Sequence, residues 1–185
     1  MKLCNFAILC IVTVTFFSFI MITTAWVDYD LVVVETMNDT AEPMEYKITK
    51  KRADRFTFVI DGTVGFTDLN GCDSELKIYY SAPDSTKFAL SPFKLPRAPI
   101  EQALNQDYRK YLMNPLKDFS DLPYSEDEEV DLYKEFLHHK FTINKFLLHN
   151  TTIPADLADG TYKCYLFIYK GLDVLNAIHV MLRLY

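Results

Sequence analysis

The sequence predicts a mostly β domain, a sandwich or a barrel, with one or two short helices. Short segments in which apolar and polar residues alternate recur along the chain, as in half-buried strands. Turn residues such as Asn70-Gly71 and Asp159-Gly160 separate these segments. A helical spacing of apolar residues begins only after Pro99. Several short strands with turns between them favour an antiparallel sandwich or barrel.

The N-terminus has the pattern of a secretory signal peptide. Met1-Lys2 precedes an apolar run over residues 3–22, and Thr23-Thr24-Ala25 places small residues at positions −3 and −1 of a cleavage site. The alternative is an uncleaved signal anchor, because the run is long enough to span a membrane. Only one basic residue flanks the run, which favours cleavage. We therefore expect a signal peptide over residues 1–25 and one secreted, extracellular domain over residues 26–185, with no stable membrane insertion afterwards.

The charge of the mature chain restricts its partners. Without the signal, 18 basic and 25 acidic side chains remain, a net charge of −7. Phosphate backbones and anionic lipid surfaces are bound through Lys and Arg, so we expect no nucleic-acid partner.

Two cysteines, Cys72 and Cys164, remain in the mature chain. In an oxidising compartment an even pair predicts one disulfide, and the alternative is two buried thiols. The sequons at Asn38 and Asn150 predict glycosylation and agree with secretion.

The first predicted strands form a hairpin. In residues 55–67 apolar and polar residues alternate, and the apolar positions are rich in aromatic and β-branched side chains. Residues 75–80 alternate in the same way. Asn70-Gly71 between them supplies a hairpin turn. Residues 87–95 are the next predicted strand, which Pro96 and Pro99 end.

The middle of the chain predicts helix and loop. From Ile100 the apolar residues recur at helical spacing through Leu112, which predicts an amphipathic helix of about three turns. Residues 116–131 are acidic and predict a solvated loop or the first turn of a second helix.

The last third predicts three strands. Residues 140–148 alternate with a slip in parity that indicates a bulge. Residues 162–170 are apolar on one parity and carry Tyr165, Phe167 and Tyr169 on the other. Residues 177–185 alternate regularly.

The motifs of common enzymes do not occur in the sequence. It contains no G-x-S-x-G, G-x-x-x-x-G-K or H-E-x-x-H string, and neighbouring His138 and His139 would point to opposite faces of a strand. An extracellular hydrolase would need a converging polar cluster that the sequence does not indicate. We expect no catalysis, no cofactor and no metal site.

Residues 141–170 resemble the end of a lipid-recognition (ML-type) domain, in which a strand, a P-x-x-L-x-x-G-x-Y loop and a long apolar strand follow in order. Pro154, Leu157, Gly160 and Tyr162 occupy the loop pattern. Residues 56–66, the P-F-K-L-P step at 92–96 and the Y-R-K-Y segment at 108–111 are similar to divergent secreted insect proteins related to that superfamily, including the chemosensory protein B type. The resemblance implies a two-sheet, immunoglobulin-like antiparallel sandwich that holds a lipid or similar apolar molecule.

We therefore expect a binding protein for a hydrophobic small molecule or lipid, with a carrier or chemosensory (pheromone-response) role. The alternative is a secreted protein–protein interaction module with a filled core, which presents Tyr165, Phe167 and Tyr169 or the acidic loop to a receptor or other extracellular protein. The residues expected to line the ligand site are the apolar-parity positions of the strands and three positions of the helix: Phe56, Phe58, Ile60, Phe66, Ile78, Tyr80, Leu104, Tyr108, Leu112, Phe141, Ile143, Leu166, Ile168, Ile178 and Val180. The same positions would be core if there were no cavity.

Overall fold

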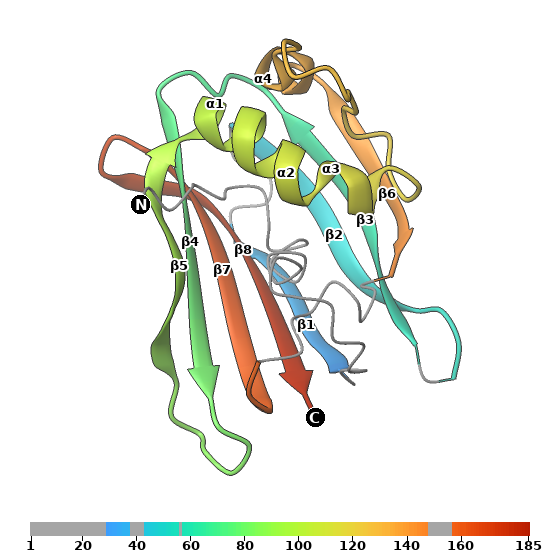
Figure 1. Cartoon of the computed structure of the whole chain (residues 1–185), viewed down its shortest axis with the longest axis vertical. Coiled ribbons are helices and arrows are strands. Elements are labelled where there is room, and N and C mark those ends of the chain that lie inside the picture. The colour runs from blue at the N-terminus through green and yellow to red at the C-terminus, as the bar shows by residue number, and fades with distance from the viewer. Residues whose placement is uncertain (1–28, 38–42, 56, 148–156) are drawn as a thin grey trace.

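Antiparallel pairing organises the chain into two sheets that face each other (Figure 1). The computed structural model describes residues 29–37, 43–55, 57–147 and 157–185. These residues form eight strands and several short helices, which confirms the predicted mostly β, two-sheet antiparallel sandwich. The predicted signal peptide, the sequons at Asn38 and Asn150, and Phe56 lie outside the described residues.

The larger sheet has five strands, in the order β1-β8-β7-β4-β5. The smaller sheet has three, in the order β2-β3-β6. β1 packs beside β2 and so joins the sheets on one side of the sandwich, whereas β5 and β6 end them on the other. The strand bounds are β1 Tyr29–Met37, β2 Met44–Arg52, β3 Phe58–Phe66, β4 Cys72–Ser81, β5 Ala89–Pro99, β6 Lys140–Phe146, β7 Gly160–Lys170 and β8 Asp173–Leu184.

The predicted hairpin is wrong. β3 and β4 belong to different sheets, where β3 pairs with β2 and β6, and β4 pairs with β5 and β7. Gly71 does turn, with φ of +69°, but the connection carries the chain from one sheet to the other. Leu69 in this connection is buried in the core. Alternation identifies the buried face of a strand but not the neighbouring strand, so it could not distinguish a hairpin from a crossing.

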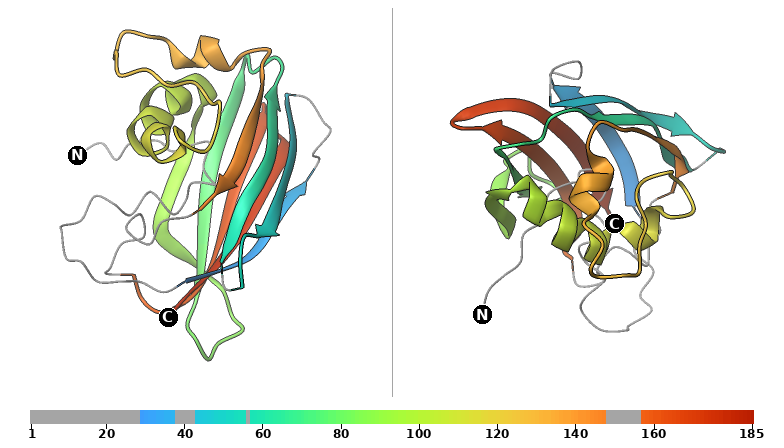
Figure 2. Two further views of the ribbon diagram at one scale, coloured as in Figure 1. Left: turned by 90° about the vertical axis from the view of Figure 1, so that its right-hand side faces the viewer. Right: turned by 90° about the horizontal axis from the view of Figure 1, so that it is seen from above.

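The predicted helix after Pro99 is confirmed and has a π-helical middle. It consists of α1 (Ile100–Gln102), the π-helical segment η2 (Ala103–Tyr108) and α2 (Arg109–Tyr111), and α3 (Met113–Leu116) follows. We call residues 100–116 the helical cover. It leaves the end of β5, and the chain after it pairs with β6 through Ser120 and Ile143. The helical cover thus crosses the side of the sandwich where the two sheets are not joined (Figures 1 and 2).

The remaining helix and strands follow the sequence closely. The acidic segment is a loop up to α4 (Leu132–Phe136). In β6 the four residues from Ile143 to Phe146 lie opposite three residues of β3, from Ile60 to Gly62, which is the predicted bulge. β7 and β8 pair along their whole length, so that Leu166 lies opposite Ile178 on one side and opposite Leu76 of β4 on the other.

Strand β5 runs past the predicted stop. It continues through Pro96 to Pro99, because it is the last strand of its sheet and needs hydrogen bonds on one side only. Its register against β4 shifts twice, once around Pro92 and once around Pro96. The prolines therefore bend this strand instead of ending it.

The predicted disulfide is also wrong. Cys72 lies opposite Lys170, and Cys164 lies opposite Ile78, so the two cysteines are six positions apart along β4 and β7. That offset corresponds to about 20 Å, whereas a disulfide needs Cα atoms within about 7 Å. Both thiols are buried and do not bond to each other. Among the described residues, no helix is long and apolar enough to cross a membrane.

Candidate binding site

The interior between the sheets gathers the residues that the sequence analysis selected. Fourteen of the fifteen are described, and they belong to one apolar cluster or pack against it. Phe58 and Tyr80 are half-buried at its margin. The other twelve are buried: Ile60, Phe66, Ile78, Leu104, Tyr108, Leu112, Phe141, Ile143, Leu166, Ile168, Ile178 and Val180.

An aromatic cluster joins the helical cover to the smaller sheet. Phe136 of α4 is fully buried, and its ring lies 4.9 Å from that of Tyr108, 5.1 Å from Phe66 and 5.5 Å from Phe141, measured between centroids. All three contacts are edge-on, the geometry that aromatic quadrupoles favour. Phe136 of α4 thus links the helical cover to β3 and β6 of the smaller sheet.

Tyr108 also has a polar contact. Its hydroxyl donates to the carbonyl oxygen of Pro123 at 2.7 Å, and burial raises the pKa of Tyr108 far above its ordinary value. This bond connects the inner side of the cover to the acidic loop.

The outer side of the cover holds the same loop through Arg109. Its guanidinium donates to the carbonyl oxygens of Ser125, Asp127 and Val130. Asn105, one turn earlier, donates to Asp131 at 2.8 Å, and this bond is the main reason why the pKa of Asp131 is lowered. The loop is therefore fixed to the helix although its acidic side chains at 126–129 are exposed.

Two of the pockets lined by described residues bear on a ligand site. One, of about 700 Å³, is an open groove on the outside, between the cover at Asn105, Arg109 and Met113 and the loop at 124–128. The other, of about 160 Å³, opens at the end of the sandwich where residues 29–31 approach Thr57 and Phe58. Of the residues selected from sequence, only Phe58 lines either of them.

Asp107 is a buried polar residue of the helical cover that was not among the predicted lining residues. It lies in η2, is 1% exposed, and neither carboxylate oxygen has a hydrogen-bond partner. Desolvation raises the pKa of Asp107 from its ordinary 3.8 to about 7. The signal was present, because Ile100, Ala103, Leu104 and Asp107 have the i, i+3, i+4, i+7 spacing of a buried helical face.

The outer face of the larger sheet carries Tyr165, Phe167 and Tyr169, as predicted. These rings do not stand alone. Tyr165 stacks on His179 with centroids 4.4 Å apart, and the Lys77 ammonium lies 5.4 Å from the centroid of Phe167. Tyr169 is only 9% exposed.

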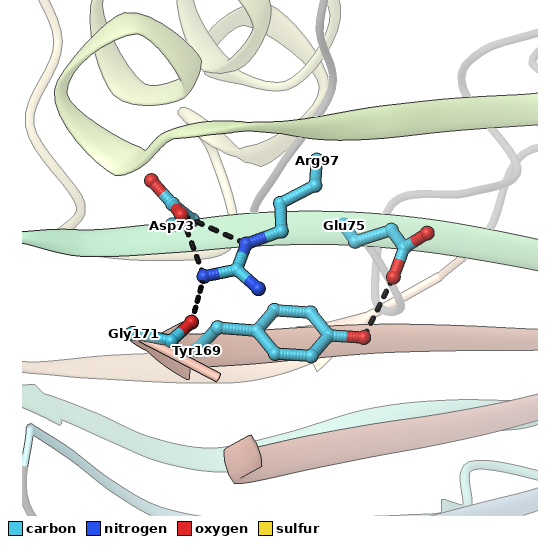
Figure 3. A network of polar contacts seen from close by, with 5 residues as sticks. All are labelled: Asp73, Glu75, Arg97, Tyr169 and Gly171. Carbon is cyan, nitrogen blue, oxygen red and sulfur yellow. Dashed lines mark hydrogen bonds and ion pairs between the residues drawn. The ribbon is translucent and has the colours of Figure 1, made fainter. Parts of the chain in front are cut away.

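A polar network surrounds Tyr169 (Figure 3). The Arg97 guanidinium lies over the ring, 4.3 Å from its centroid, and forms an ion pair with Asp73 at 2.7 Å. The Tyr169 hydroxyl donates to Glu75 at 2.6 Å; burial, and then this bond, raise the pKa of Tyr169. Arg97 also donates to the carbonyl of Gly171. The faces of these rings are thus already occupied by the protein's own side chains.

The described residues contain no cluster of three or more His, Cys, Asp or Glu side chains placed to hold a metal ion. The fold and site define a two-sheet β-sandwich with an apolar interior and a helical cover on its open side. The chain matches no protein-family model, and a search of curated proteins finds no match. The relationship to the lipid-recognition superfamily therefore stays a prediction from the sequence.

Proposed function

We propose that this chain is a secreted, non-catalytic binding protein that carries a hydrophobic small molecule or lipid between its sheets, under the helical cover. The observation that carries the proposal is the asymmetry of the sandwich. β1 and β2 join the sheets on one side, while on the other a separate helical element lies over the apolar interior. An element that closes a sandwich without joining either sheet can be displaced without breaking a strand pair.

The driving force would be burial of apolar ligand surface. Each square ångström removed from water contributes about 25 cal/mol before ordering costs. The interior supplies aliphatic and aromatic side chains from both sheets and from the cover, such as Ile60, Ile178 and Leu104. Apolar side chains of this kind typically line the sites of hydrophobic ligands.

The proposal is tested with the mature protein, secreted from a eukaryotic host. Native mass spectrometry followed by organic extraction should release one apolar molecule per chain, and the emptied protein should take up a fluorescent apolar probe. Leu166→Phe, which adds volume to the interior, should reduce probe uptake several-fold. Met181→Phe is the matched control, because Met181 lies on the outer side of β8. A chain that is isolated empty and takes up no probe would overturn the proposal.

A second candidate is a secreted interaction module that binds a receptor or other extracellular protein. The observation that favours it is the acidic segment 126–129, which is exposed and yet held in one shape by Arg109. The double variant Glu128→Lys, Glu129→Lys should then abolish binding to a basic protein partner and leave probe uptake unchanged. Loss of probe uptake in that variant would contradict a separate interaction surface.

A further inference from the structure

The buried carboxylate of Asp107 forms no hydrogen bond with the described residues. It is 1% exposed, and neither oxygen accepts a hydrogen bond. Lys110, one turn later, is exposed, and its charge lowers the pKa of Asp107 without coming within hydrogen-bond distance. Buried polar groups in proteins nearly always have a partner, so one without a partner requires an explanation.

Asp107 lies on the inner, buried face of the helical cover. On the same helical face lie Ile100, Ala103 and Leu104, all buried. The carboxylate also sits in the π-helical part of the cover, and such insertions in helices are frequent at functional sites. Leucine at this position would bury the same face without the cost of desolvating a carboxylate. A polar group kept here at that cost is best explained by a ligand that completes its hydrogen bonds.

We infer that Asp107 accepts a hydrogen bond from the hydroxyl group of an otherwise apolar ligand, held under the helical cover. This inference rests on the proposed function and names the ligand class: a long-chain alcohol or a sterol, which share one hydroxyl on an apolar body. The rest of the ligand would contact the apolar interior, to which Leu104 and Tyr108 of the cover belong.

Two other head groups fit less well. A carboxylate ligand would place a second negative charge beside Asp107, in a chain that is acidic overall. An ammonium ligand would have to lose its hydration together with the carboxylate. In such buried ion pairs the cost of desolvating both charges offsets most of their attraction. A hydroxyl donates one hydrogen bond and brings no second charge. The pKa of about 7 for Asp107 is consistent with this, because a hydroxyl can bond to the acid or to its anion.

The test measures displacement of a fluorescent apolar probe from the mature, delipidated protein. The competitors are 1-dodecanol, dodecanoic acid, dodecylamine and dodecane, with cholesterol and the hydroxyl-free 5-cholestene as a second pair. We expect 1-dodecanol or cholesterol to bind about tenfold more tightly than its hydroxyl-free analogue. The pair that shows this difference identifies the source of the hydroxyl.

Variants then assign the effect to Asp107. Asp107→Leu should remove the tenfold preference, and Asp107→Asn, whose amide oxygen still accepts, should keep part of it. Asp118→Asn, at an exposed position, is the matched control and should keep all of it. An unchanged preference in Asp107→Leu, or tighter binding of dodecylamine or dodecanoic acid than of dodecanol, would overturn the assignment while probe uptake still supports a carrier. Absence of probe uptake in every variant and in the unmodified protein would overturn the carrier proposal itself.

Discussion

The hydroxyl of Tyr108 donates to the carbonyl oxygen of Pro123 at 2.7 Å, while its buried ring packs edge-on against that of Phe136. Tyr108→Phe keeps the ring and removes this bond, so we expect a loss of about 1–2 kcal/mol in the free energy of unfolding, measured by urea titration. Tyr124→Phe is the control, because that exposed hydroxyl bonds to the exposed Glu126, and it should change stability by less than about 0.5 kcal/mol. Equal effects of the two variants would contradict the anchoring role of Tyr108.

Arg109 holds the acidic loop by donating to three carbonyl oxygens. Arg109→Ala leaves them without this donor, and we expect a loss of about 2–3 kcal/mol together with faster proteolysis within residues 117–131. Arg109→Lys should recover only part of the stability, because one ammonium cannot replace the planar fork. Lys94→Ala, at an exposed position of β5 outside this segment, should leave the cleavage rate unchanged. A lysine variant as stable as the unmodified protein would contradict this role of the Arg109 guanidinium.

Gly62 is required by its surroundings and by its backbone conformation. Its φ is +153°, and a Cβ there would lie 2.0 Å from the carbonyl oxygen of Lys47 on β2. Gly62→Ala should therefore cost about 3 kcal/mol or more, or prevent folding, as judged by circular dichroism and yield. Gly71→Ala is the matched control, since φ there is +69° but nothing lies within 4 Å, and it should cost about 1 kcal/mol. A Gly62→Ala protein as stable as Gly71→Ala would show that β2 and β3 are not in this register.

Asp107 should make the stability depend on pH in an unusual direction. Its pKa is raised from 3.8 to about 7 in the folded state, so between these values the folded chain binds a proton more tightly than the unfolded chain. Protonation of Asp107 thus contributes up to about 4 kcal/mol to the free energy of unfolding below pH 4. This contribution is lost as the pH rises to 7. Compared with Asp107→Asn at each pH, the unmodified protein should lose stability over this window. Parallel pH curves for the two proteins would contradict the burial of an unpartnered carboxylate.

The position of the cysteines predicts the result of peptide mapping. Because Cys72 and Cys164 lie six positions apart on neighbouring strands, no peptide linking these two residues should appear after non-reducing digestion of the secreted protein. Cys72→Ser should then have the same loop entropy in its unfolded state as the unmodified chain, and should lose only the buried contacts of one thiol. Detection of a Cys72–Cys164 linked peptide would show that one of the two strands is shifted in register.

Local patterns were sufficient for the class of fold and for most of the elements. Alternation in β7 and β8 correctly identified the side chains that face the core. The change from alternating to helical spacing of the apolar residues at Ile100 located the start of the helical cover. Local patterns could not predict which strands pair with one another. β4 lies between β5 and β7, and its neighbour β7 begins about eighty residues later, a relation that no short pattern contains.

The apolar residues of the candidate site could be predicted from the sequence, but its polar residue could not. Selecting residues by hydrophobicity excluded Asp107 automatically, although its spacing placed it on the buried helical face. The outer aromatic residues were also foreseen, but their partners were not. Arg97 reaches the ring of Tyr169 from β5, two strands away, so the contact depends on the order of the strands in the sheet.

The three prolines of β5 have a consequence for how copies of this chain meet one another. β5 ends the larger sheet, and an end strand with a complete row of amide hydrogens is a template for a further strand. Pro92, Pro96 and Pro99 carry no amide hydrogen, and the register shifts around the first two interrupt the row again. Leu90 and Phe93 are exposed on this same strand. The prolines therefore allow apolar side chains to remain at the border of the sheet while they oppose aggregation by edge-to-edge addition of strands from other molecules.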